Sequence, residues 1–154
     1  MRVRMRMVVI PLGSAGGRYN DMNINVKLLR KIAKHITEEP RRFIMRSFVY
    51  TADSWGDRFR GDDGLEHKFA ECGTAACIGG WAVILSQGTQ YMGEYRHRAI
   101  SLLGLEGMNE DRLFEVSQWP SRFEKRYRTA KTQRQRAKVA AERIEHFIAT
   151  KGVE

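Results

Sequence analysis

The feature that most constrains the fold is an uncharged, largely apolar stretch near the middle of the chain, from Ala75 to about Ser86. Its apolar residues fall on every side of a helix, whereas a surface helix would keep one polar side. We therefore expect a central, buried helix, capped at its start by Thr74. Gly79 and Gly80 each cost about 1 kcal/mol in a helix interior, which indicates that another backbone approaches closely there.

Two other segments predict amphipathic helices with clear start signals. Apolar residues recur at steps of three and four over 25–38, and either Asn23 or Asn25 can cap this helix. Near the end of the chain, Thr132 and Gln135 form a capping box ahead of a long apolar stripe. We expect the helix from Thr132 to pack across the central one.

The remaining segments predict shorter elements. Helices are expected at about 91–103, directly after Asn109, and from Pro120. Residues 41–71 are rich in glycine, aspartate and serine toward their end, which favours a long irregular loop or a short hairpin. The predicted fold class is therefore mainly α, a helical bundle around a buried central helix.

The length and composition indicate one domain. The chain has 154 residues, of which 42% are hydrophobic, enough to close a single core without metals or disulfides. We expect this domain to span residues 22–152 and to follow a flexible basic arm at 1–21. No apolar run approaches the roughly 20 residues that cross a bilayer, so no membrane partner is expected. The oligomeric state has no signature in the sequence.

Charge is distributed unevenly along the chain. The net charge is +9, with +4 in residues 1–20, −1 in residues 21–120 and +6 in residues 121–154. Clustered lysines and arginines attract phosphates, so the basic C-terminal segment is a candidate nucleic-acid-binding surface, assisted by the arm. A solvated helix surface explains the same charge. The candidate residues are Arg122, Lys125, Arg126, Arg128, Lys131, Arg134, Arg136 and Lys138.

Cys72 is a weak catalytic candidate, because a thiol just before a helix has its thiolate favoured by free backbone N–H groups. The run from Cys72 to Cys77 resembles the nucleophile segment of peptidases that cleave double-glycine leaders. Such enzymes need a histidine base, and neither His97 nor His146 lies in a suitable sequence context. Both cysteines are therefore expected to be small core residues, with a Cys72-dependent thiol hydrolase or transferase as the alternative.

A metal site is the weaker possibility for the same region. His67, Cys72 and Cys77 are separated by four residues each time and supply three of the four ligands that zinc requires. A helix from Ala75 would turn Cys77 away from the other two, so no metal and no cofactor is predicted. Two closely spaced cysteines do not form the disulfide framework of a small secreted domain, which favours a cytoplasmic location.

The order of several motifs resembles a functionally unassigned family of small bacterial and phage-associated proteins. The motifs that carry the resemblance are, in order, Glu-Glu-Pro at 38–40, Phe43 and Met45, Cys-Gly-Thr-Ala-Ala-Cys-Ile-Gly-Gly-Trp-Ala at 72–82, Leu-Leu-Gly-Leu at 102–105, Leu-Phe at 113–114, Trp-Pro at 119–120 and the segment 136–144. It covers about residues 22–150, with 51–66 as an apparent insertion, and it implies no catalytic residue. We therefore expect a non-enzymatic binding module with an acidic partner, either nucleic acid or an acidic protein.

Overall fold

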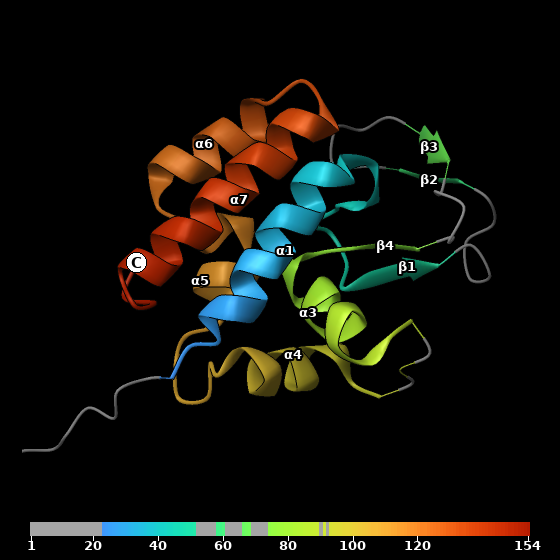
Figure 1. The fold of residues 1–154 in the computed structure, drawn as a ribbon. Coiled ribbons are helices and arrows are strands. Elements are labelled where there is room, and N and C mark those ends of the chain that lie inside the picture. Colours follow the sequence, from blue (N-terminus) through green and yellow to red (C-terminus); the bar gives the residue numbers. More distant parts are fainter. Residues whose placement is uncertain (1–22, 52–57, 61–65, 69–73, 90, 92) are drawn as a thin grey trace, which may run out of the picture.

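The computed structural model describes residues 23–51, 58–60, 66–68, 74–89, 91 and 93–154 (Figure 1). The predicted mainly α-helical, single-domain fold is confirmed. The α-helices are α1 (Val26–Glu38), α3 (Ile78–Gln87), α4 (Tyr95–Leu103), α5 (Asp111–Phe114), α6 (Ser121–Thr129) and α7 (Gln133–Ala149). Two 3-10 helices, η1 (Pro40–Arg42) and η2 (Val116–Gln118), and four short strands, β1 (Val49–Thr51), β2 (Arg58–Arg60), β3 (Glu66–Lys68) and β4 (Thr74–Ala76), complete the described elements.

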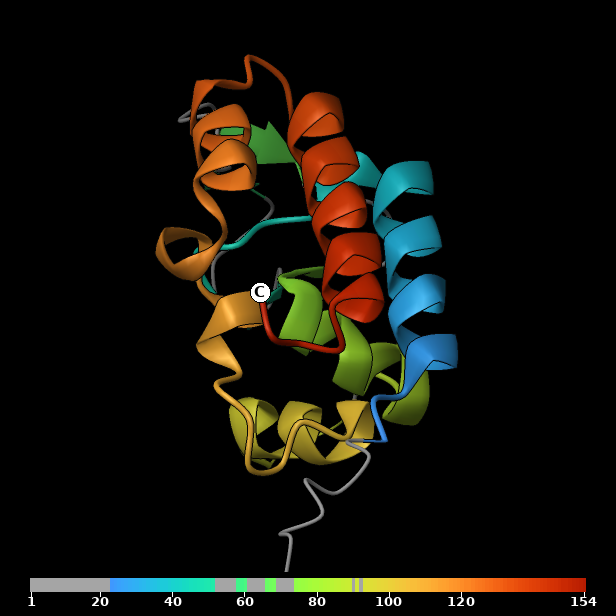
Figure 2. The ribbon, with the colours of Figure 1, turned by 90° about the vertical axis from the view of Figure 1, so that its left-hand side faces the viewer.

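Three helices form a layer on one side of the molecule. α7 lies between α1 and α6 and packs against both (Figure 2). Behind this layer, α3 packs chiefly on α4 and also contacts α1 and α5. The prediction that the helix from Thr132 packs across the central helix is wrong, because α7 makes its principal contacts with α1 and α6.

The start of α1 follows the sequence prediction. The side chain of Asn25 caps the helix by accepting a hydrogen bond from the backbone N–H of Leu28 at 3.0 Å. Its amide nitrogen also donates to the carbonyl oxygen of Leu102 at 3.0 Å. Asn25 therefore satisfies an otherwise unpaired N–H group in the first turn of α1 and connects α1 to the end of α4.

The central helix starts three residues later than predicted. Thr74–Ala76 form β4, which pairs antiparallel with β1, and the predicted cap at Thr74 is wrong. Cys77 is the cap instead, with its sulfur 3.4 Å from the backbone nitrogen of Gly80. A uniformly apolar run contains no periodicity that separates a buried strand from a buried helix, so the boundary has no sequence signal. From Ile78 to Ile84 every residue of α3 is buried, as expected for a central helix.

The expectation of a close backbone approach at the paired glycines is confirmed. A Cβ atom at Gly80 would overlap the carbonyl group of Phe48, in the segment leading into β1. At Gly79 the nearest atoms belong to the side chain of Phe48. The backbone of the β1 strand region therefore lies directly on the first turn of α3, which only glycine at position 80 permits.

The two-sided capping box of α7 is present as predicted. The hydroxyl of Thr132 accepts from the backbone nitrogen of Gln135 at 3.2 Å, and the side-chain oxygen of Gln135 accepts from the backbone nitrogen of Thr132 at 3.2 Å. α4 begins at Tyr95, four residues after the predicted start, and Gly104 ends it at a φ of 68°. α6 follows Pro120 directly.

An arginine lies fully inside the core. Arg143 is 0% exposed and donates from Nη2 to the carbonyl oxygen of Arg112 at 2.6 Å. Its Nη1 lies 3.2 Å from Nδ1 of His146, and its guanidinium carbon lies 5.4 Å from the centre of the Phe147 ring. Burial lowers the pKa of Arg143 to about 10.

Candidate functional site

Most of the predicted nucleic-acid-binding residues lie on the surface of the hairpin that α6 and α7 form. Seven of the eight are exposed, and the eighth is Arg136. The connection between the two helices is only three residues long, from Ala130 to Thr132, because α6 ends at Thr129 and α7 begins at Gln133. Cations from the end of one helix and the start of the other are thereby brought to one end of the hairpin.

Arg136 does not belong to this surface, contrary to the prediction. It is 6% exposed, and its guanidinium carbon lies 5.9 Å from the centre of the Tyr127 ring, on the side of α7 that faces the core. Two of its nitrogens, Nε and Nη1, are buried and have no hydrogen-bond partner. The amphipathic pattern predicts that an arginine is solvated, whereas here its long side chain packs against an aromatic ring and reaches only slightly toward water.

Two of the exposed arginines are held by carboxylates. Arg126 pairs with Glu142 of α7, with 2.5 Å between Nη1 and Oε2. Arg128 pairs with Glu124 one turn earlier in α6, with 2.9 Å between Nε and Oε1. The hydrogen bond to Glu142 raises the pKa of Arg126 further above its usual value, so this guanidinium stays charged.

The other exposed cations of the predicted set have no carboxylate partner within the part of the chain that the structure describes. They are Arg122, Lys125, Lys131, Arg134 and Lys138. By contrast, exposed cations of α1 are partly neutralised, since Arg30 pairs with Glu145 and Lys34 with Glu38. The acidic residues of the α1–α6–α7 layer therefore leave most of its uncompensated charge on the α6–α7 hairpin.

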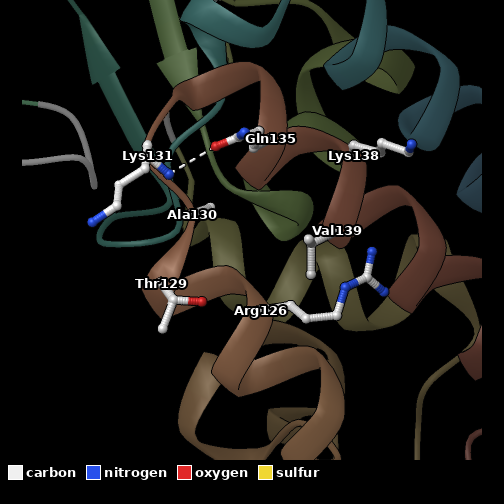
Figure 3. A pocket seen from close by; sticks show the side chains of 7 residues that line it. All are labelled: Arg126, Thr129, Ala130, Lys131, Gln135, Lys138 and Val139. Carbon is white, nitrogen blue, oxygen red and sulfur yellow. Dashed lines mark hydrogen bonds between the residues drawn. The ribbon is translucent and has the colours of Figure 1, made fainter.

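An open pocket lies at the end of the hairpin, between α6 and α7 (Figure 3). Its volume is about 380 Å³. It brings together three of the predicted residues, which come from α6, from the connection and from the second turn of α7. The lining residues are Arg126, Thr129, Ala130, Lys131, Gln135, Lys138 and Val139.

The polar pocket residues Gln135 and Thr129 already make hydrogen bonds within the protein. The side-chain oxygen of Gln135 accepts from the backbone nitrogens of Lys131, at 2.8 Å, and Thr132, at 3.2 Å. The hydroxyl of Thr129 donates to the carbonyl oxygen of Lys125 at 2.8 Å. The groups left for a ligand are mainly donors, namely the Gln135 amide nitrogen and the three cationic side chains.

Sequence reasoning missed four of the pocket residues. Thr129, Ala130 and Val139 carry no charge, and Gln135 was recognised only as a helix cap. The sequence does contain one signal for these residues, the short connection between the two predicted helices. Such a connection places the residues before and after it side by side. Side-chain contacts across the hairpin are needed to show which of them face one another.

The described residues give little support to the alternative thiol site or to the metal site. Cys77 is buried, and desolvation raises its pKa to about 11, which opposes formation of a reactive thiolate. Cys72 lies outside the described residues, and His67 is described only as a member of β3, paired with Phe59 of β2. No group of three or more metal-binding side chains occurs among the residues with described positions.

Comparison of the chain with protein-family models, with curated proteins and with solved structures finds no match. The family resemblance noted from the sequence therefore stays a prediction. Within the described segments, no helix combines the length and apolar character needed to cross a membrane.

Proposed function

We propose that the protein is a non-enzymatic nucleic-acid-binding module that uses the exposed face of the α6–α7 hairpin. The observation that carries the proposal is the group of five exposed cations there that lack carboxylate partners in the described structure. Residues 121–140 contain eight lysines and arginines and one acidic residue, Glu124. Such a surface gains free energy when phosphates replace its bound counterions.

The distribution of the cations favours a phosphate backbone over an acidic protein. The cations occur from Arg122, at the start of α6, to Lys131 in the connection and Lys138 in α7. They are distributed along both helices and the connection, which suits a polymer with regularly repeated charges. An acidic protein surface is the alternative partner, and it is one outcome of the test below.

The test is binding of a fluorescent, unrelated oligonucleotide across a salt series, measured by anisotropy. We expect the logarithm of the association constant to fall linearly with the logarithm of salt concentration. The double variant Arg134→Gln/Lys138→Gln should lower the steepness of this dependence by about 2, because each cation accounts for about one phosphate contact.

The matched control is Arg30→Gln/Lys34→Gln, which removes two exposed cations that are already paired with Glu145 and Glu38. It lowers the net charge by the same amount but should leave the salt dependence nearly unchanged. Equal losses in both double variants would show attraction to net charge alone. Absence of binding at low salt would refute the proposal, and binding to an acidic polypeptide instead would identify the alternative partner.

A further inference from the structure

The pocket at the end of the α6–α7 hairpin combines two kinds of surface. Ala130 and Val139 supply methyl groups to its interior, while Lys131 and Lys138 lie at its borders on either side (Figure 3). A site for a simple inorganic anion needs only hydrogen-bond donors, and such an anion gains nothing from contact with apolar carbon atoms. This combination suits an organic phosphate whose non-ionic part covers the methyl groups.

The polar groups of the pocket that are free to bind a ligand are mainly donors, so they favour a ligand that carries hydrogen-bond acceptors. The oxygen of Gln135 is held by two backbone N–H groups, so its amide nitrogen is the part available to a ligand. The side chains of Lys131 and Lys138 have no partner among the residues whose positions are described. A nucleotide offers the corresponding acceptors on its phosphate, its sugar and the edge of its base.

Arg126 adds a flat guanidinium that is paired with a carboxylate. Its guanidinium is anchored to Glu142 across the hairpin, at 2.5 Å between Nη1 and Oε2. A planar guanidinium can stack on an aromatic ring, and prior anchoring reduces the side-chain freedom lost when it does so.

We propose that this pocket receives one nucleotide of a single strand, with the base against Ala130, Val139 and the face of Arg126. The adjoining phosphates then lie on Lys131 and Lys138. In a duplex the bases are stacked inside the helix and cannot enter such a pocket, so the site distinguishes single strands from duplexes. The volume of about 380 Å³ lies within the usual range for small-ligand pockets. This inference rests on the proposed function and specifies the form of nucleic acid recognised.

The experiment fills the pocket without changing charge. Ala130 is half-buried and has an extended backbone, with φ of −60° and ψ of 136°, so Ala130→Phe places a ring in the pocket without requiring a strained conformation. Ala149→Phe adds the same ring at an exposed position near the end of α7 and is the matched control. The probes are a ten-nucleotide thymidine strand, the same strand without bases, and a duplex of equal length.

We expect Ala130→Phe to weaken binding of the thymidine strand at least tenfold and to leave duplex binding within twofold, with Ala149→Phe resembling the original protein. The strand without bases should bind the original protein at least tenfold more weakly than the thymidine strand. Unchanged affinity of the filled variant for all probes overturns the inference while leaving the proposed function intact.

The comparison of strands with and without bases uses the unaltered protein, so it remains decisive if Ala130→Phe does not fold. Equal affinity for these two strands overturns the pocket assignment. Failure of every probe to bind at low salt overturns the proposed function and the inference together. Circular dichroism of each variant establishes that it retains the helical fold.

Discussion

Replacement of Gly80 by alanine tests the contact that places α3 against the strand region. A Cβ atom there would overlap the carbonyl oxygen of Phe48 and would lie 2.8 Å from Cβ of Ala76. Both obstacles are close to the backbone, so relief requires the segment before β1 to move. The same carbonyl oxygen accepts a hydrogen bond from the backbone nitrogen of Cys77 at 3.3 Å, which would be lost in that movement.

The expected cost of Gly80→Ala is about 3 kcal/mol in the free energy of unfolding. Overpacking of a core costs about 1–3 kcal/mol, with the upper end expected for overlap with backbone, and a hydrogen bond contributes about 1 kcal/mol. The gain of about 1 kcal/mol from the higher helix propensity of alanine offsets part of this. At about 3 °C per kcal/mol, the midpoint of thermal unfolding should fall by about 10 °C.

Gly79→Ala is the matched control because it makes the same substitution one residue earlier in the same helix. Its Cβ atom would lie 2.6 Å from Cε1 of Phe48 and 3.4 Å from Cε1 of Phe114, which are side-chain atoms able to shift. The propensity gain and the ring displacement should nearly cancel, leaving the free energy of unfolding within about 1 kcal/mol of the original. Urea unfolding followed by circular dichroism measures both variants. If Gly80→Ala proves as stable as Gly79→Ala, the described backbone approach is wrong.

Three further predictions concern caps, thiols and pH. Thr132→Ala should lower the free energy of unfolding by about 1 kcal/mol in urea titrations, because the capping box is lost, whereas Thr129→Ala, whose hydroxyl bonds only within its own helix, should lower it less. In a Cys72→Ala background, Cys77 should resist iodoacetamide at pH 8 until urea is added, as followed by mass spectrometry, since burial raises its pKa to about 11; rapid labelling of the folded protein would contradict this. Burial and the nearby Arg42 lower the pKa of His35 below 6.5, so its neutral form is favoured in the folded state; the stability it contributes is complete above pH 6.5 and is lost as the pH falls toward the folded-state pKa. Unfolding measured between pH 7.5 and pH 5.5 should therefore depend less on pH in His35→Gln than in the original protein, and identical pH dependence would refute the assignment.

Helices with one apolar side and a recognisable cap could be predicted from the sequence. The start of α1 at Asn25 and the capping box at Thr132 depend on side chains within four residues, so local sequence contains the needed information. The start of α3 depends instead on pairing of Thr74–Ala76 with Val49–Thr51, more than twenty residues away. No local pattern reports a partner at that distance.

The surface charge of the candidate site could be predicted, but its organisation could not. Arg136 has the same sequence context as the exposed cations around it, yet it packs on Tyr127 inside the hairpin. Arg143 is likewise concealed in the core, although charged residues are rarely buried without an acidic partner. Which side of α7 faces α6 is decided by tertiary packing, and that choice determines both the pocket and the two buried arginines.

The β1–β4 ladder has a consequence for how the chain can vary in length. Thr51 and Thr74 are directly opposite each other in this ladder, so the two ends of the segment between them lie close together. The entropy lost on bringing the ends of a segment together rises only with the logarithm of its length. The segment between Thr51 and Thr74 can accordingly be exchanged, shortened or lengthened while the helices keep their arrangement.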